Sequence, residues 1–200
     1  GLDIIGIGRS ASRGLRKGVV VNVDQTVEAL KKAVEEAELM AGVGVERAFV
    51  GVAGGHIKGF NSRGVIAISG RDREVSREDV ERVIESARAV QLPTDRLIFH
   101  AVPQDFILDD QDGIRDPVGM HGSRLETNVH IVTGAIPTLN NITNCVNRAG
   151  IEVVEMVLEQ LAASETVLTP DEKELGVALV DIGGGTTDLA ILQRGAICHT

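Results

Sequence analysis

The stretch VALVDIGGGTTDLAIL, residues 177–192, places two apolar runs on either side of a glycine-rich turn. Val177, Leu179 and Asp181 would share one face of a strand, with Ala178, Val180 and Ile182 on the other, and the same alternation of faces resumes from Asp188. We therefore expect residues 183–187 to join two antiparallel strands. An ordinary tight hairpin needs only one Asn-Gly or Asp-Gly pair, so three successive glycines indicate a turn with a further purpose.

The composition of this turn fits a binding site for phosphate groups. Successive glycines allow positive φ angles and let backbone N–H groups converge with no Cβ in the way, which forms a concave nest for anionic oxygens. Thr186 and Thr187 would add hydroxyl donors, and Asp181 would hold a hydrated Mg²⁺ that bridges phosphates. The residues predicted to bind a nucleotide are Asp181, Gly183, Gly184, Gly185, Thr186 and Thr187, with the metal at Asp181.

Other interpretations of the turn can be weighed from the same residues. A flexible glycine-rich connection capped by two aspartates is the structural alternative. Asp188 is expected to help position the turn and is not assigned to the site itself. The turn is not a Walker loop, since it contains no Gly-Lys-Ser or Gly-Lys-Thr, and it is not a dinucleotide fingerprint, since it opens no helix.

The composition of the whole chain bounds its class and partners. Of its 200 residues 43% are hydrophobic, enough for one substantial core or two small ones. The formal net charge of −9 repels phosphate backbones, so nucleic acid is not expected as a partner, and the basic residues 8–18 are expected to be a flexible, solvated loop. No apolar run approaches the length of a membrane span. Cys145, Cys198 and the 5 histidines match no metal-ligand spacing, and two isolated thiols suit a reducing cytosol.

Outside the hairpin, strands and helices alternate in the pattern of an α/β fold. Residues 2–8 predict a buried core strand, and Asp24 predicts the N-cap of a helix that ends at Gly42. Further strands are expected over residues 47–55 and 151–158, and further helices over residues 136–149 and 159–168. The charged, proline-containing residues 169–176 then predict a connector at a domain boundary.

A block of different character interrupts this alternation. A strand is expected over residues 64–69, followed by a helix that opens with the capping box of Ser76 and Asp79. Two long strands follow, over residues 96–109 and 125–134. Pro103 indicates an edge position or a bulge in the first of them. The block is thus expected to be an inserted α+β subdomain of strand, helix, strand and strand. The polar face of its helix is a candidate surface for protein interaction, although none of its residues is individually predicted as a site residue. This face carries Arg77, Glu78, Glu81, Arg82 and Glu85.

The order Asp181-Ile-Gly-Gly-Gly-Thr-Thr-Asp188 resembles the second phosphate-binding hairpin of the actin, Hsp70 and sugar kinase superfamily. Four longer stretches, residues 34–57, 76–90, 96–134 and 158–191, together resemble the FtsA family of bacterial cell-division proteins, essentially from end to end. The resemblance implies half of an actin-like, ribonuclease H-like α/β fold with an inserted subdomain. It assigns residues 1–55 and 134–175 to subdomain 1A, residues 56–133 to subdomain 1C, and residues 176–200 to the start of subdomain 2A.

The FtsA resemblance implies a protein that binds ATP with Mg²⁺, polymerises on the cytoplasmic face of the membrane at the division site, and tethers FtsZ there to assemble the septum. It further implies self-association through the 1C subdomain, contacts with later division proteins, and a membrane contact made only by a C-terminal amphipathic helix that is absent from this chain. An actin-like type IV pilus assembly protein of the PilM type is the nearest alternative. A sugar kinase or an Hsp70-type ATPase is a more distant one.

The resemblance also implies that the chain is a fragment. The family's first phosphate hairpin is expected near the start of the chain, but an additional Ile precedes Gly6 and no return strand follows, so we interpret residues 3–8 as a later core strand. With one of two phosphate hairpins, the chain is expected to bind ATP weakly or not at all. No catalytic residue is assigned. The intact protein is expected to be at most a weak ATPase, and this fragment is not expected to be an enzyme.

Overall fold

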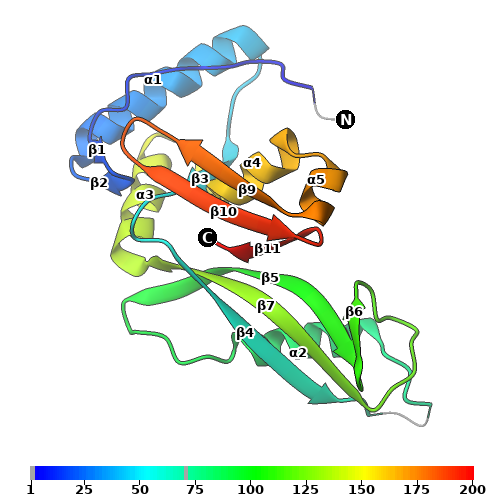
Figure 1. Cartoon of the computed structure of the whole chain (residues 1–200). Helices are drawn as coiled ribbons and strands as arrows, with labels where there is room; N and C mark the ends of the chain where they lie inside the picture. Colours follow the sequence, from blue (N-terminus) through cyan, green and yellow to red (C-terminus); the bar gives the residue numbers. More distant parts are fainter. Residues whose placement is uncertain (1–2, 70–71) are drawn as a thin grey trace.

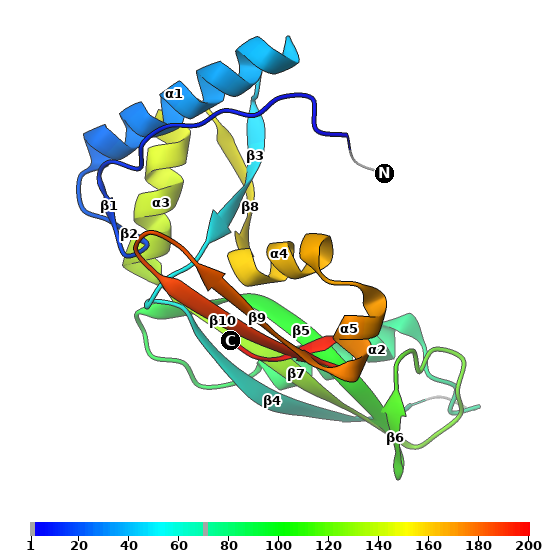
Figure 2. The same cartoon turned by 45° about the horizontal axis from the view of Figure 1, so that its top comes forward.

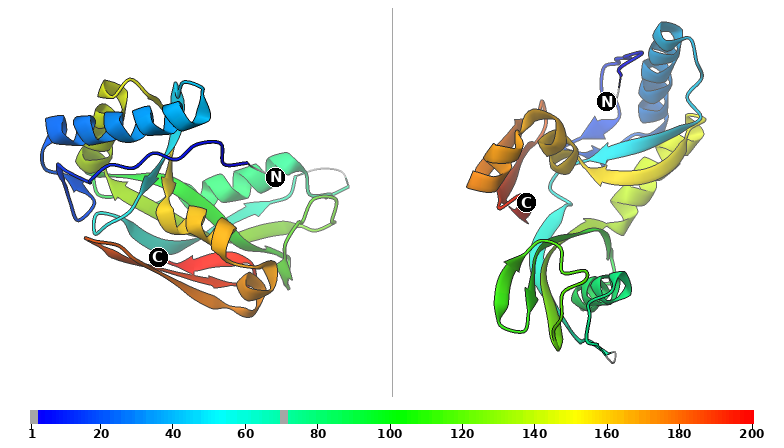
Figure 3. Two further views of the ribbon diagram at one scale, coloured as in Figure 1. Left: turned by 90° about the horizontal axis from the view of Figure 1, so that it is seen from above. Right: turned by 90° about the vertical axis from the view of Figure 1, so that its right-hand side faces the viewer.

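A computed structural model describes residues 3–69 and 72–200, which form three groups of elements (Figure 1). The first group contains a parallel strand pair, the short hairpin of residues 15–20 and two helices, the second a four-stranded sheet and one helix, and the third a three-stranded sheet and two short helices. The elements in chain order are β1 (Leu15–Arg16), β2 (Val19–Val20), α1 (Val23–Ala41), β3 (Arg47–Val52), β4 (Lys58–Ala67), α2 (Arg77–Arg88), β5 (Arg96–Leu108), β6 (Gln111–Ile114), β7 (Arg124–Ala135), α3 (Ile136–Arg148), β8 (Glu152–Leu158), α4 (Glu159–Val167), α5 (Pro170–Leu175), β9 (Val177–Ile182), β10 (Thr187–Gln193) and β11 (Ala196–His199). Figure 3 shows the second group at one end of the molecule, away from α1.

The first group is built on β3 and β8, which pair in parallel. α3 packs on β8, and α1 packs on α3. α1 begins after Asn22, whose side chain accepts a hydrogen bond from Gln25 N at 3.0 Å. The predicted N-cap at Asp24 is therefore wrong: Asp24 lies inside the first turn, where its charge complements the helix dipole. Gly42 ends the helix as predicted, with a φ of 71° that favours glycine.

Residues 3–8 do not form the predicted core strand. They run alongside α1, and at Gly8 the two backbones approach so closely that a Cβ would lie 1.6 Å from Ala33 O. Ile4 is 81% exposed, which rules out a buried core position. The physical reason is the lack of a partner, because within the described residues β3 and β8 pair only with each other and offer this segment no ladder. Leu2, where the predicted strand begins, lies outside the described residues.

The second group, called the inserted module here, has the sheet order β4-β7-β5-β6. Strand, helix, strand and strand follow one another as predicted, with the short β6 as an addition that the glycine-rich sequence did not indicate. β4 begins at Lys58 rather than at residue 64, and its ladder with β7 starts at the pair Lys58↔Thr133. The predicted bulge is confirmed, because the β5–β7 register shifts between Pro103 and Asp105.

α2 covers one face of the inserted module and closes its core. The predicted capping box is confirmed: Asp79 N donates to Ser76 Oγ at 3.2 Å, and Ser76 N donates to Asp79 Oδ2 at 3.0 Å. Beneath the helix lie apolar side chains of β5, β6 and β7, among them the fully buried Leu125, Val129 and Ile131. The opposite face of the sheet meets the third group.

The third group contains the predicted hairpin. β9 and β10 pair antiparallel, and β11 extends this sheet as a strand that the sequence analysis missed. β11 lies against the inserted module, where Gln104 Nε2 donates to Ile197 O at 2.9 Å. The predicted connector is mostly helical, since residues 170–175 form α5 behind a capping box of Thr169 and Glu172. Among the described residues, no helix combines the length and apolar character that crossing a membrane requires.

Candidate functional site

The β9–β10 turn lies where loops of the first group converge. Figures 1 and 2 both place this turn beside the tip of the β1–β2 hairpin. β3 leads into residues 53–55 and β8 leads into Glu159, so the carboxyl ends of both parallel strands open toward the same region. The carboxyl edge of a parallel sheet is where α/β proteins generally bind ligands.

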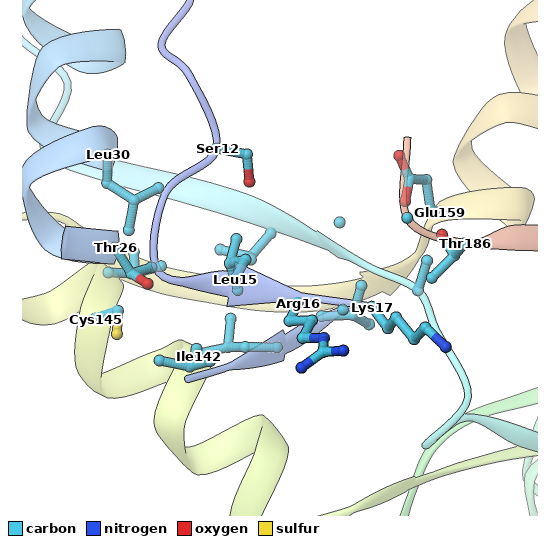
Figure 4. Close-up of a pocket in the computed structure, with 18 of the residues that line it drawn as sticks. Ser12, Leu15, Arg16, Lys17, Thr26, Leu30, Ile142, Cys145, Glu159 and Thr186 are labelled. Atoms are coloured by element: carbon cyan, nitrogen blue, oxygen red, sulfur yellow. The ribbon is translucent and has the colours of Figure 1, made fainter. Parts of the chain in front are cut away.

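Two cavities flank the turn. The larger, of about 840 Å³, is lined by Gly184, Gly185 and Thr186 together with Glu159 (Figure 4). The smaller, of about 620 Å³, is lined by Gly185, Thr186, Thr187 and Asp188. Lys17, Gly185 and Thr186 are the residues common to both linings. The structure therefore brings four of the six predicted site residues to cavity walls, whereas Asp181 and Gly183 line neither cavity.

The glycines do not serve the backbone role that the sequence predicted. None of Gly183, Gly184 and Gly185 has a positive φ, so that expectation is wrong. Gly183 N donates to Thr186 O at 3.0 Å and closes the turn with an ordinary hydrogen bond. A Cβ at Gly184 would meet no atom within 4 Å. Neither backbone conformation nor internal packing requires glycine at Gly184, and the same is true of Gly51 and Gly55. What distinguishes Gly184 is its place in a turn of three successive glycines at a cavity wall.

Three carboxylates gather behind the turn. Asp181 and Asp188 are directly opposite each other in the β9–β10 register, and like charges in that arrangement are destabilising. Partial burial raises the pKa of Glu159, and the charges of Asp181 and Asp188 raise it further. The sequence analysis missed Glu159, although its position directly after the parallel strand β8 is a usable signal.

Asp188 also holds the chain that leads into the inserted module. Its Oδ1 accepts a hydrogen bond from Gly54 N at 3.2 Å. Gly54 is buried with a φ of 115°, and a Cβ there would lie 2.9 Å from Lys17 O. This bond fits the expected positioning role of Asp188, which links the turn to the first group.

The residues present fit a phosphate-bound cation better than an all-protein metal site. Within residues 3–69 and 72–200, no group of three or more His, Cys, Asp or Glu side chains is arranged to hold a metal ion. A Mg²⁺ at Asp181 would take its other ligands from water and phosphate oxygens, which is the usual coordination of this ion at nucleotide sites. The open amides of the turn and the carboxylates behind it are compatible with that arrangement.

The smaller cavity holds polar groups that sequence reasoning missed. Both ring nitrogens of His56 and the Oε1 of Gln160 are buried without a hydrogen-bond partner. Burial lowers the pKa of His56, and the neighbouring charge of Arg96 lowers it further. Gln160 is only 4% exposed. Unsatisfied groups of this kind usually contact water or a ligand, so they mark the cavity as a polar one.

The basic stretch of residues 8–18 is not simply the flexible loop that was expected. Residues 15–20 form the β1–β2 hairpin, and Gly14 O accepts hydrogen bonds from Val21 N and Asn22 N at 2.8 and 3.0 Å. The hairpin places Lys17 beside the glycine-rich turn (Figure 4). No periodic pattern could predict so short a hairpin, since each of its strands has two residues.

Comparison with solved structures supports this fold. The chain superposes on a chain of the PilM-PilN type IV pilus biogenesis complex with a TM-score of 0.62 and 12% sequence identity, covering 94% of this chain and 50% of that one. Residues 54–133 match the family model described as the SHS2 domain inserted in FTSA. The fold is therefore that of an actin-like α/β protein into which an SHS2 domain is inserted, as the sequence predicted.

The particular relatives come from sequence similarity over the whole chain. The chain is 54% identical to the cell division protein FtsA of Pseudomonas aeruginosa, 45% to that of Bacillus subtilis and 40% to that of Escherichia coli K12. It is thus homologous to a segment of FtsA, and residues 54–133 form its SHS2 domain. The chain spans about half the length of these curated relatives, with coverage of 47%, 45% and 47%.

Proposed function

We propose that the chain is the segment of a bacterial cell-division protein that binds the phosphates of ATP on one side and carries a protein-interaction module on the other. The observation that carries the first part is the turn of three successive glycines, of which Gly184 and Gly185 line the larger cavity although none of the three has a positive φ. The 54% identity to an FtsA protein supports the second.

In the proposed site, different groups of the turn bind the phosphate oxygens and the metal ion. The N–H groups of Gly184 and Gly185 and the hydroxyls of Thr186 and Thr187 donate to phosphate oxygens, while Asp181 holds the hydrated Mg²⁺. Asp188 holds the turn next to Gly54 by accepting a hydrogen bond from its backbone N–H. When bound, the metal neutralises phosphate charge and also relieves the repulsion between Asp181 and Asp188.

The described residues supply one glycine-rich turn, which predicts weak binding of ATP by this chain. Most of the triphosphate would face water, where each charged contact contributes little. No described side chain is assigned as a catalyst, and hydrolysis in the longer protein is proposed to be slow at most. We assign residues 1–55 and 134–175 to subdomain 1A, residues 56–133 to subdomain 1C, and residues 176–200 to subdomain 2A.

The proposal for the longer protein follows the FtsA likeness. It would polymerise at the cytoplasmic face of the membrane, tether FtsZ at the division site, and contact later division proteins. Self-association is assigned to the inserted module. The PilM likeness, at 12% identity, concerns the fold and does not favour a pilus function over one in division.

A titration of this chain with Mg-ATP tests the phosphate site. We expect chemical-shift changes of the amides of residues 183–187 in ¹⁵N–¹H spectra, with saturation only at high ligand concentration. Changes confined to other residues, or none, would remove the turn as the site. Low-micromolar affinity would instead contradict the expectation that one turn binds weakly.

A further inference from the structure

The β1–β2 hairpin presents a lysine at a position that turn geometry does not favour. β1 and β2 are joined by the two-residue turn Lys17–Gly18, in which φ is 51° and 75°. Two positive φ values in such a turn favour Asn or Gly at the first position. The β10–β11 turn has the same arrangement, with φ of 53° at Arg194 and 79° at Gly195, so the conformation alone does not single out Lys17, and the assignment rests on where the residue lies.

Close backbone contacts hold the tip of this hairpin in place. A Cβ on Gly18 would lie 2.3 Å from Ala53 O, and one on Gly54 would lie 2.9 Å from Lys17 O. On the other side, a Cβ on Gly185 would stand 3.7 Å from Lys17 N. The backbone of Lys17 is therefore wedged between the end of β3 and the glycine-rich turn, and its side chain starts from a defined position.

The side chain lies at the junction of the two cavities. Two basic residues, Arg16 and Lys17, line the larger cavity. Lys17 also lines the smaller cavity, whereas Arg16 does not. In Figure 4, Lys17 extends toward the side where Thr186 and Glu159 lie, whereas the guanidinium of Arg16 turns away from them. Lys17 forms no ion pair within the part of the chain that the structure describes.

The charge balance of the region calls for a cation on the ligand side. Asp181, Asp188 and Glu159 surround the base of the turn, so a polyphosphate bound by backbone amides alone would meet net negative charge. A Mg²⁺ would offset part of it. A lysine ammonium beside the turn supplies the rest as a compact point charge, which is how lysines bind phosphate.

We propose that the Lys17 ammonium binds the polyphosphate of the nucleotide together with the amides of Gly184 and Gly185, from the β1–β2 side of the site. This inference rests on the proposed function of the turn and adds the residue that balances the charge of the anion. Lys17 is thus assigned as a binding residue from the first group. The phosphate site is then formed by the β1–β2 turn and the β9–β10 turn together.

The test uses inorganic tripolyphosphate, the 200-residue chain and two charge-matched variants, followed by ¹⁵N–¹H spectra at low ionic strength. Lys17→Asn removes the cation but keeps a residue that tolerates positive φ, so the turn is retained. Arg16→Gln removes one positive charge at the neighbouring residue. We expect Lys17→Asn to weaken binding about tenfold, as for the loss of one charged hydrogen bond, and Arg16→Gln to weaken it less than about twofold.

Each outcome decides between the proposals. Equal dissociation constants for the unaltered chain and Lys17→Asn, with shifts still seen at residues 183–187, would overturn the role of Lys17 and leave the turn as a phosphate site. Equal losses in both variants would overturn it too, because they would reflect net charge only. No shift at residues 183–187 in the unaltered chain would overturn the proposed function itself. Thermal unfolding of both variants checks that they remain folded.

Discussion

Asp181 and Asp188 are directly paired across the β9–β10 ladder, one at the end of the incoming strand and one at the start of the return strand. Two carboxylates in this position repel each other in the absence of a cation. Replacing Asp181 by Asn should therefore raise the free energy of unfolding by about 0.5 kcal/mol in metal-free, low-salt buffer. Urea denaturation measures the change, and the gain should shrink as salt screens the repulsion.

Asp112→Asn provides the control for this variant, because Asp112 is an exposed carboxylate in β6, in the inserted module. It should leave the free energy of unfolding nearly unchanged, so that a gain confined to Asp181→Asn reports the carboxylate pair. A loss of stability in Asp181→Asn would mean that Asp181 makes a favourable internal contact, which would contradict the interpretation of the carboxylate pair.

A substitution at Gly184 should weaken anion binding without lowering the stability of the fold. Since a Cβ at this position meets open space and φ is not positive, Gly184→Ala should keep the free energy of unfolding or raise it by up to about 0.5 kcal/mol. The same methyl group would obstruct the approach of an anion to the backbone. Binding of tripolyphosphate should fall about fivefold, corresponding to the loss of one hydrogen bond.

Gly44→Ala is the matched control, because Gly44 is exposed, has no positive φ and lines neither cavity, and a Cβ there would make only an ordinary contact of 3.7 Å with Glu38 Oε1. It should change neither stability nor anion binding appreciably. If Gly184→Ala bound tripolyphosphate as well as the unaltered chain does, glycine at this position would not serve ligand access.

His130 predicts an acid-sensitive stability. Its ring is fully buried, with Nδ1 2.7 Å from Asn61 Oδ1 and Nε2 3.0 Å from Thr200 Oγ1. Burial, assisted by the charge of His199, lowers the pKa of His130 to about 4 from its ordinary value of 6.5. The unfolded chain then binds more protons between these values, so stability is complete above pH 6.5 and falls by up to about 3 kcal/mol as the pH drops through 4.

Unfolding free energies measured in urea between pH 4 and 7 test this effect. His130→Gln keeps a polar side chain and should flatten the pH dependence, although it lowers stability at neutral pH. The exposed His121, changed to Gln, should leave the slope unaltered. His56 and His100 also have a lowered pKa and contribute a residual slope in every variant. The interpretation fails if His130→Gln and the unaltered chain show the same slope.

Arg96 ties together the two chain segments that join the inserted module to the rest of the protein. Its Nη2 donates to His56 O at 2.9 Å, to Thr133 O at 2.8 Å and to Thr133 Oγ1 at 2.9 Å. Arg96→Met would leave these acceptors without their charged partner, and should lower the free energy of unfolding by about 1–3 kcal/mol. Limited proteolysis should show faster cleavage at residues 53–57.

Arg47→Met removes an exposed ion pair with Glu152 and serves as the comparison. Such pairs contribute about 0–1 kcal/mol, so this variant should stay close to the unaltered chain in both assays. Equal effects of the two substitutions would show that Arg96 does not hold the segments together.

Local signals in the sequence predicted much of the fold. The short apolar runs on both sides of residues 183–187 predicted β9 and β10, and the pair Ser76 and Asp79 predicted the start of α2, because both patterns depend on neighbouring residues only. Pro103 predicted its bulge for the same reason. These features could be predicted without knowing which distant segments pack against them.

Features that depend on distant partners escaped prediction. Residues 3–8 have the composition of a buried strand, but a strand also requires a neighbour, and α1 is the element beside them. The cavity positions of Lys17, Glu159 and Gln160 arise from segments far apart in the chain. The sequence therefore predicted the site residues that belong to the β9–β10 turn. The cavity residues from other segments, Lys17, Glu159 and Gln160, could be identified only in the folded molecule.

The pairing of Lys58 with Thr133 brings the entry and the exit of the inserted module together. Residues opposite each other in a ladder are roughly 5 Å apart, so the chain departs for the SHS2 domain and returns from it at nearly one point. A host interrupted there needs no rearrangement of its own strands, and a short peptide would rejoin the cut ends. Removal of residues 58–133 should therefore leave the pairing of β3 with β8 intact.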